Sequence, residues 1–152
     1  GVTSVIDGPS NTASLVALGA SYAAATFCNS LNAGSGLNDY TDWYLPARNE
    51  LEVLYYFLKP TTAANNTGNG SNAYAVSPEP ISTAYTSGSP TQTSAGIGFR
   101  TGETDAFASG TYWSSTEISS IFAWGQVFNN GSQANFSKND SFYVRAVRRI
   151  PI

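Results

Sequence analysis

The side chains that could perform chemistry in this 152-residue chain are mainly carboxylates and hydroxyls, because it has no histidine and a single cysteine, Cys28. Without histidine neither a Ser-His-Asp nor a Cys-His nucleophile can form, and zinc sites rich in imidazole are excluded. Cys28 falls on the apolar stripe of a predicted helix, which favours a small buried hydrophobe over a reactive thiol. One cysteine also excludes an internal disulfide.

Two pairs of carboxylates are spaced closely enough for acid–base work. Glu103 and Asp105 stand in "TGETDAF", and Asp39 and Asp42 stand in "NDYTDW". Carboxylates at such spacing in loops are usually solvated or act as caps, so catalysis is the minor interpretation. A dedicated calcium loop needs denser acidic spacing than any loop shows here, and calcium stays the minor alternative. We therefore expect no catalytic residue, no metal and no cofactor.

The composition limits the classes of partner. The net charge is −3, and charged residues are 11% of the chain, less than half the usual share. A nucleic-acid partner is disfavoured because phosphate binding needs a basic patch. No apolar run approaches a membrane span, and no signal peptide opens the chain. The polar, weakly charged style suits virion and extracellular proteins, and a chain starting at "GVTSVIDG" looks like part of something longer.

Two helices are predicted to support the remaining elements. An apolar face of 3.6-residue period predicts the first at about residues 20–33, ended by Gly34. Its inward residues would be Ala20, Ala24, Phe27, Cys28 and Leu31. The second is predicted at 47–58, after Pro46 and before Pro60, with Ala47 as a weak N-cap. Its inward residues would be Leu51, Leu54, Tyr55 and Leu58.

The rest of the chain divides into an irregular segment and a β-rich end. Residues 61–110 are rich in Thr, Asn, Gly, Ser and Pro, but interspersed apolar residues favour an ordered excursion packed on the core. These are Tyr74, Val76, Ile81, Tyr85, Ile97 and Phe99. "TYWSS" predicts a strand, Asn130-Gly131 predicts a hairpin, and "FYVRAVRRI" predicts a closing strand. Helices followed by strands indicate one α+β domain over residues 1–152.

Five motifs in this order resemble a known family. "DWYLPARNEL", "YWSSTE", "AWGQVF", "NNG" and "YVRAVRRI" are similar to C-type-lectin-like domains typified by the C-terminal domain of the Legionella collagen-like protein. The resemblance implies two helices flanking a small twisted antiparallel sheet with long irregular loops. It also implies recognition without chemistry, often from a trimeric fibre such as a phage tail-fibre tip or an adhesin. The acidic and amide motif of calcium-dependent sugar binding is not found.

Strand alternation separates two faces of the hairpin. Trp124 and Phe128 share one face, and the resemblance places that face inward as scaffold. Gly125 and Val127 then point outward, beside Ala134 and Phe136 of the paired strand. On this basis Val127, Ala134, Phe136 and Phe142 are expected to be substantially exposed, and Trp124 and Phe128 buried.

The same segment resembles the variable regions that retroelements diversify by changing adenines in Asn codons. The scaffold positions would be Trp113, Glu117, Trp124, Phe128, Gln133, Lys138 and Tyr143. The variable, ligand-contacting positions would be Ile118, Ile121, Phe122, Gly125, Val127, Ser132, Ala134, Phe136, Asp140 and Phe142. None of these is Lys, Glu, Gln, Met or Trp, which this mechanism cannot produce. The alternative is that Phe136 and Phe142 fill the core or a trimer seam.

These observations predict a receptor-binding domain of a homotrimer, on a virion or a cell surface, whose partner is a host surface protein or glycan. A module that only trimerises a fibre is the first alternative, and an enzyme of the formylglycine-generating type is the second. That enzyme uses reactive cysteines, which Cys28 alone does not supply. Glu117 and Arg145 are expected in a partly buried ion pair or hydrogen-bond network, and a ligand role for Arg148 or Arg149 is the minor interpretation.

Overall fold

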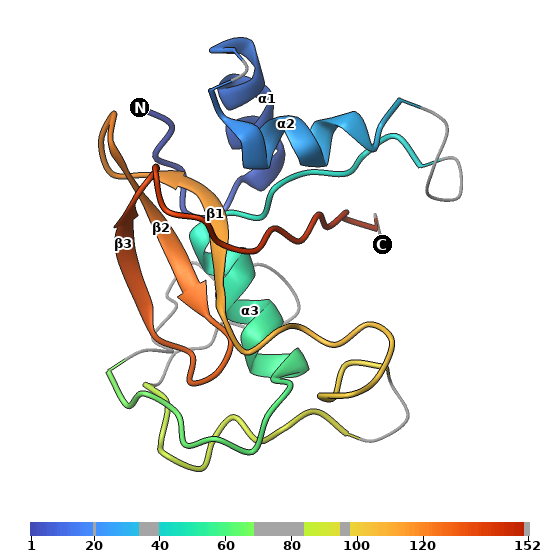
Figure 1. Ribbon diagram of the computed structural model, residues 1–152, viewed down its shortest axis with the longest axis vertical. Helices are drawn as coiled ribbons and strands as arrows, with labels where there is room; N and C mark the ends of the chain where they lie inside the picture. Colours follow the sequence, from blue (N-terminus) through green and yellow to red (C-terminus); the bar gives the residue numbers. More distant parts are fainter. Residues whose placement is uncertain (20, 34–39, 69–83, 95–97, 151–152) are drawn as a thin grey trace.

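A computed structural model describes residues 1–19, 21–33, 40–68, 84–94 and 98–150 (Figure 1). Within these residues the helices are α1 (Gly8–Ala17), α2 (Ala23–Ser30) and α3 (Arg48–Leu58). The strands are β1 (Thr111–Glu117), β2 (Phe122–Val127) and β3 (Gln133–Ser137), which form an antiparallel sheet in the order β1-β2-β3. The helices precede the strands along the chain, which confirms the predicted α+β class.

The N-terminal helix pair differs from the prediction. Helix α1 was not predicted, although Asp7 accepts a hydrogen bond from the Ser10 N–H (3.2 Å) and Pro9 stands in its first turn. Helix α2 is shorter than the predicted 20–33. Phe27, predicted to face inward, is 51% exposed, because the eight-residue helix packs through its small residues Ala25 and Cys28 instead.

Helix α3 matches the prediction within one residue. The weak N-cap at Ala47 is compensated by one partner within the helix and by two tertiary partners. Glu50 Oε2 accepts from the Ala47 N–H at 2.8 Å. The next two N–H groups, of Arg48 and Asn49, donate to Thr116 Oγ1 at 3.0 Å and to the Val5 carbonyl at 2.8 Å. The helix start is therefore positioned by β1 and by the N-terminal segment.

The hairpin between β2 and β3 confirms the turn predicted at Asn130-Gly131. Its loop is longer than a two-residue turn, spanning residues 128–132, and Gly131 adopts a positive φ of 75°. The Gly131 N–H donates to the Val127 carbonyl at 2.8 Å, and the Phe128 N–H donates to Gly110 at 2.9 Å. The loop thus turns Phe128 toward the core while closing the hairpin.

The main core is an aromatic cluster between α3 and the sheet. Phe128 is fully buried; its ring stacks on Phe107 with centroids 4.1 Å apart and meets the Tyr55 and Tyr112 rings edge-on. A second, aliphatic cluster of Leu15, Ala25, Cys28 and Leu45 lies between α1 and α2.

The described part of the irregular segment is anchored on α3 by a buried lysine. Lys59, 2% exposed, donates from Nζ to Asn65 Oδ1 (2.8 Å), to the Pro90 carbonyl (3.3 Å) and to the Ala63 carbonyl. Asn65 also accepts from the Tyr55 hydroxyl at 2.6 Å. The predicted packing of this segment is confirmed at Tyr85, which is buried, and at Phe99, which packs on the core. Tyr74, Val76, Ile81 and Ile97 lie outside the described residues.

The C-terminal segment is not the continuous strand that its pattern predicted. It runs beside β1 and makes two isolated bridges, at Tyr143 to Tyr112 and at Val147 to Tyr44 (Figure 1). The Tyr143 N–H donates to the Thr111 carbonyl and the Trp113 N–H donates to Tyr143, both at 3.0 Å. The segment changes partner between the two bridges, from β1 to the chain before α3, and this interrupts the ladder.

Candidate functional site

The two faces of the hairpin are those that alternation predicts. Trp124 faces α3, where the Arg48 guanidinium lies 3.8 Å from its ring centroid. Phe128 is buried in the same direction. Gly125 stands opposite Ala134 on the other face, against the Phe136 ring. Trp124 was expected to be buried, but its indole is only half-buried. The reason is that the partly solvated Arg48 side chain covers the ring, whereas the hydrophobic core does not enclose it.

The outer face of the sheet carries three aromatic rings that pack on one another. Trp113 lies 4.8 Å from Phe142 and 6.3 Å from Phe136 between ring centroids, and Phe136 lies 4.8 Å from Phe142. We call these three residues the outer aromatic cluster. Phe136 and Phe142 were expected to be substantially exposed, as were Val127 and Ala134, and all four are half-buried. Mutual packing of the rings accounts for the difference at Phe136 and Phe142.

Gly125 was predicted to be a ligand-contacting position, but in the structure it is not available for contact. It is buried, and a Cβ there would lie 3.0 Å from both the Phe136 ring and the Thr111 methyl group. Its role is to leave room for Phe136 against the sheet.

The turn between β1 and β2 exposes three apolar side chains of the predicted set. Ile118 is 45% exposed, Ile121 62% and Phe122 38%. The backbone beneath them is well bonded: Ser119 Oγ accepts from the Ile121 and Phe122 N–H groups, and the Ile118 N–H donates to the Phe122 carbonyl at 2.9 Å. We call Ile118, Ile121 and Phe122 the apolar turn. Its side chains project from a structured loop.

The remaining predicted positions lie around these two groups. Asp140 is exposed in the turn after β3, and the Lys138 N–H donates to the Ile121 carbonyl, so this turn and the apolar turn are neighbours. Val127 and Ser132 lie at the other end of the hairpin, where Val127 precedes the five-residue loop and Ser132 is its last residue. The structure therefore places the Asp140 turn beside the apolar turn and groups Phe136 with Phe142 in the outer aromatic cluster, and it places Ser132 and Val127 at the opposite end of the hairpin.

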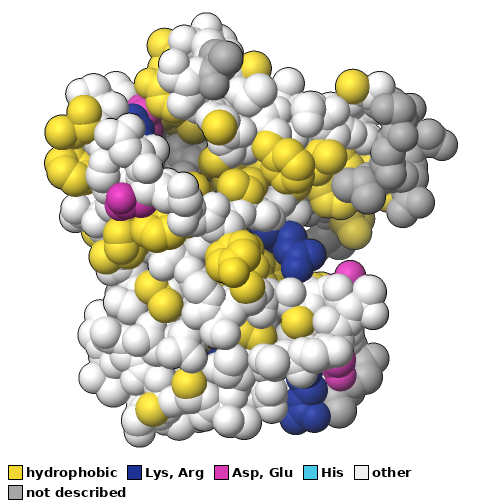
Figure 2. Space-filling model, in the orientation of Figure 1, with side chains coloured by type: hydrophobic (Ala, Val, Ile, Leu, Met, Phe, Trp, Pro, Cys, Tyr) yellow, Lys and Arg dark blue, Asp and Glu magenta, His cyan; other side chains and the backbone are white. Residues whose placement is uncertain are grey.

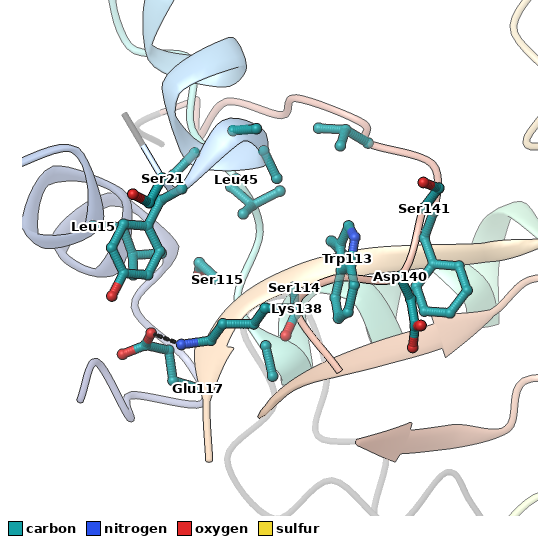
Figure 3. A pocket seen from close by; sticks show the side chains of 17 residues that line it. Leu15, Ser21, Leu45, Trp113, Ser114, Ser115, Glu117, Lys138, Asp140 and Ser141 are labelled. Atoms are coloured by element: carbon teal, nitrogen blue, oxygen red, sulfur yellow. Dashed lines mark hydrogen bonds and ion pairs between the residues drawn. The ribbon is translucent and has the colours of Figure 1, made fainter. Parts of the chain in front are cut away.

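A cavity of about 370 Å³ lies between the helices α1 and α2 and the outer face of the sheet (Figure 3). The sheet side and the chain after it contribute Trp113, Asp140 and Phe142, while the helical side contributes Leu15 and Tyr22. Figure 2 shows a recess on this face, with apolar side chains on both sides of it. On the helical side α1 contributes Leu15, and no sequence pattern predicted this helix, although Asp7-Gly8-Pro9 is a capping signal. The start of α2 contributes Tyr22, and its packing against the sheet is a tertiary contact that helical periodicity does not predict.

A partly buried ion pair between Glu117 and Lys138 lines one end of this cavity (Figure 3). Lys138 Nζ donates to Glu117 Oε1 and to the carbonyls of Ser119 (2.9 Å) and Ser120 (3.1 Å). Glu117 Oε2 accepts from the Val2 N–H at 2.7 Å. Burial opposes ionisation of Glu117, but the bonds from Lys138 and Val2 outweigh it and hold its pKa below the ordinary value. The prediction of a partly buried ion pair or hydrogen-bond network at Glu117 is confirmed, with Lys138 as the ionic partner, and these bonds connect the hairpin to the N-terminal segment.

The three C-terminal arginines have partners within the chain. Arg145 donates to the Asp105 carbonyl at 2.8 Å, and its guanidinium lies 4.6 Å from the Phe107 centroid. Arg148 pairs with Asp42 at 2.8 Å, and Arg149 pairs with Glu50 at 2.7 Å. These contacts agree with the structural interpretation of the arginines.

The carboxylates and the cysteine that were considered for catalysis do not form a common site among the described residues. Glu103 accepts from the Arg100 N–H at 3.0 Å, and Asp39 lies outside the described residues. Cys28 is fully buried, and burial raises the pKa of its thiol to about 12. Among the described residues no group of three or more His, Cys, Asp or Glu side chains could hold a metal ion. The helices in the same residues include none that is long and apolar enough to cross a membrane.

Comparison with known families identifies the domain. Neither the comparison with curated proteins nor that with solved structures gives a match. The family model of the Lcl C-terminal domain matches residues 8–148, which include all the helices, the whole sheet and every residue of the cavity described above. The match confirms the resemblance that the five sequence motifs indicated, and the chain therefore belongs to the Lcl C-terminal domain family.

Proposed function

We propose that this chain is a non-catalytic receptor-binding domain with a C-type-lectin-like fold, and that it recognises a host cell-surface protein or glycan. The observation that supports this most directly is the apolar turn, where Ile118, Ile121 and Phe122 are exposed on a well-bonded loop. Clustered apolar side chains with a polar surround are typical of recognition surfaces. Holding the loop in one conformation reduces the entropy lost on binding.

The parent protein in this proposal is a fibre or adhesin. Family membership is consistent with a binding or fibre-associated domain. We propose that the domain is carried as a homotrimer on a virion tail fibre or a cell surface, and that a retroelement diversifies its variable positions. A near-copy of the last forty or so codons with mismatches at adenines, next to a reverse transcriptase gene, would support diversification. Coding DNA without that arrangement would leave an ordinary binding domain.

The same apolar turn also supports the alternative of a trimerisation module. Exposed isoleucines and a phenylalanine could pack against another copy of the chain instead of a receptor. The formylglycine-generating alternative has no comparable support, because Cys28 is buried with a raised pKa and a thiol without access to solvent is a poor nucleophile.

The experiment compares Ile121→Asp with Leu18→Asp. Both side chains are about equally exposed, at 62% and 61%, but Leu18 lies at the end of α1. We expect both variants to melt close to the parent temperature, and only Ile121→Asp to lose attachment of the fluorescent domain to a panel of bacterial and eukaryotic cells. A loss of about tenfold or more in affinity corresponds to one apolar anchor.

Light scattering on the full-length parent fibre separates the two functions. If Ile121→Asp dissociates the fibre trimer and leaves attachment per subunit unchanged, the apolar turn is a trimer seam and is not the surface that contacts the receptor. If the trimer persists and attachment is lost, the trimerisation alternative is wrong.

A further inference from the structure

The buried amine of Lys59 lies against the side-chain amide of Asn65. Lys59 is 2% exposed and Asn65 6%, and the Lys59 Nζ lies 2.8 Å from Asn65 Oδ1. The Asn65 Cγ is bonded to this oxygen, so the amine stands beside an electrophilic carbon in a site that bulk water does not reach. A primary amine beside a carboxamide can displace the amide nitrogen and form a new amide bond.

The contacts of Lys59 leave one position of its nitrogen directed at Asn65. Besides Asn65 Oδ1, Nζ contacts the carbonyls of Ala63 and of Pro90, the latter at 3.3 Å. A neutral amine keeps two N–H groups, which these two carbonyls accept, and its lone pair then takes the place of the third N–H. Burial lowers the pKa of Lys59 and so increases the share of the neutral, nucleophilic amine.

The amide oxygen of Asn65 is placed to stabilise an attack on its carbon. It accepts from the Tyr55 hydroxyl at 2.6 Å, and this donor stabilises the negative charge that develops on Oδ1 as the nucleophile adds. Tyr55 is fully buried, so water does not compete for the hydrogen bond. Burial also raises the pKa of the Tyr55 hydroxyl, which keeps the group protonated and able to donate.

The nitrogen of the same amide lies among three carbonyl oxygens. Asn65 Nδ2 donates to the carbonyls of Thr86 (3.1 Å), Ser87 (3.3 Å) and Pro90 (2.9 Å). An amide nitrogen leaves its carbon only after it gains a proton, and these oxygens stabilise the positive charge that results. The Pro90 carbonyl accepts from both Nζ and Nδ2, so it holds the two nitrogens close together for the proton transfer.

We propose that Lys59 and Asn65 form an intramolecular amide bond in the folded protein. The Lys59 Nζ attacks the Asn65 Cγ, while Tyr55 donates to the oxygen of the tetrahedral intermediate. A proton passes from Nζ to Nδ2, the Cγ–Nδ2 bond breaks, and ammonia leaves. The reaction balances without an oxidant or a cofactor, because one ammonium group and one carboxamide give one secondary amide and one ammonium ion.

The Lys59 ammonium with its three acceptors is the state of the chain before this reaction. After the reaction, a covalent bond attaches the start of the irregular segment to the end of α3. This inference goes beyond receptor binding and does not depend on it.

The test measures the mass of the full chain after purification and again after several days in mildly alkaline buffer. We expect each chain to lose the mass of one ammonia molecule. Trypsin leaves both residues in one peptide, 49–100, because Lys59 is followed by Pro60. Backbone fragmentation between residues 59 and 65 should then release no separate ions, since the new bond holds the two parts together.

The second lysine of the chain, Lys138, is an internal control. Its partners are the Glu117 carboxylate and backbone carbonyls, and none of them is a carboxamide. After denaturation, an amine-reactive label should therefore modify Lys138 fully and fail to modify Lys59.

Three variants assign the roles of the groups. Asn65→Asp replaces the carboxamide by a carboxylate, which resists attack by an amine, so Lys59 should stay open to the label. Tyr55→Phe should slow the loss of ammonia about a hundredfold, as removal of one oxyanion donor does. Tyr85→Phe is the matched control, because its hydroxyl lies in the same aromatic cluster but contacts the Glu52 carbonyl, and the rate should not change. Thermal melts establish that each variant is folded.

Three results would overturn the proposal. If the parent chain keeps its full mass and Lys59 is labelled as completely as Lys138, no bond forms. If ammonia is lost while Lys59 is still labelled, the loss comes from cyclisation at an Asn-Gly pair of the sequence and not from Lys59. If Tyr55→Phe reacts as fast as Tyr85→Phe, the mechanism through the Tyr55 hydroxyl is wrong.

Discussion

At the scale of single residues, the aromatic side chains of the C-terminal third fall into two classes that sequence composition does not distinguish. Phe128 is buried among three other rings, whereas Phe136 is half-buried in the outer aromatic cluster. The two phenylalanines are eight positions apart on one hairpin. Their difference lies in what covers them, since α3 and the irregular segment close over Phe128 and solvent reaches Phe136.

We expect this difference to appear in stability. Phe128→Ala should lower the free energy of unfolding by about 3–5 kcal/mol, because it leaves a cavity in the core. Phe136→Ala should cost about 1–2 kcal/mol, because part of its ring is already solvated. Urea denaturation of both variants measures this. If Phe136→Ala lowers the free energy of unfolding as much as Phe128→Ala or more, the outer face of the sheet belongs to the hydrophobic core.

A second residue-scale prediction concerns pH. The folded pKa of Glu117 is depressed, so its charge stabilises the fold above the unfolded pKa of about 4.3 and this stability is lost as pH falls through the folded value. Glu117→Gln should therefore cost about 2 kcal/mol at pH 7, where it leaves Lys138 without its counter-ion. The cost should shrink toward zero in strong acid. Melting curves from pH 2 to 8 on both proteins test this, and a pH-independent difference would contradict it.

At the scale of elements, the fold depends on polar groups placed between segments distant in sequence. The start of α3 is bonded to β1 through Arg48 and Thr116, and the irregular segment is held at the end of α3 by Lys59 and Asn65. The Lys59 ammonium contacts three oxygens of uncharged groups, so it acts as a fixed internal cation for this segment. Burial lowers its pKa.

Replacing that ammonium should release the segment. Lys59→Met retains most of the apolar stem but removes one hydrogen-bond donor from each of the oxygens of Ala63, Asn65 and Pro90. Asn65 keeps the Tyr55 hydroxyl and Pro90 keeps the Asn65 amide as donors, and we expect a cost of about 2–4 kcal/mol. Limited proteolysis should then cut between residues 61 and 94 faster than in the parent. Arg48→Met, which removes a half-buried cation from the other end of the same helix, is the matched control. If both variants are cut at this segment at the same rate, Lys59 does not anchor the segment on α3.

The hairpin loop gives a prediction with an internal control. Gly131 and Gly102 both have positive φ, 75° and 93°, so alanine is strained at either position. A Cβ at Gly131 would also lie 2.4 Å from the Tyr55 ring, whereas a Cβ at Gly102 meets nothing within 4 Å. We expect Gly102→Ala to cost about 1 kcal/mol and Gly131→Ala at least about 1 kcal/mol more, because the core ring must move. Similar melting temperatures of the two variants would show that the Tyr55 ring can move aside at little cost in free energy.

At the scale of the whole molecule, the N-terminal segment is bonded both to the sheet and to the C-terminal segment. The N-terminal segment bonds to β1 through Val2 and Glu117, and Arg149 donates to the Ile6 carbonyl at 2.7 Å. The surface itself carries few charges, with a net charge of −3 over 152 residues. Weak self-repulsion of this kind does little to keep subunits apart.

We therefore expect the parent fibre to be a homotrimer, as proposed above. Multi-angle light scattering on the parent protein should give three times the chain mass. The isolated domain should associate only at high concentration, because it lacks the effective concentration that the proposed fibre stem would supply. A monomeric fragment is compatible with this expectation, and a monomeric parent contradicts it.

Features that depend on local periodicity and turn chemistry could be predicted from the sequence. The 3.6-residue pattern between Pro46 and Pro60 placed α3 within one residue, and the period of two assigned Trp124 and Gly125 to opposite faces of the hairpin. Side-chain direction within one element follows from backbone geometry alone, so it can be read from spacing.

The tertiary structure alone decided how deeply each face is buried and what surrounds it. The half-burial of Phe136, the buried position of Gly125 and the cavity beside Trp113 depend on segments that the fold brings together. Glu117 meets Val2 across 115 positions, for example, and no local pattern encodes such a partner. The burial of a side chain depends on the residues that pack around it. Many of these residues belong to elements distant in sequence, and only the packed core places those elements beside it.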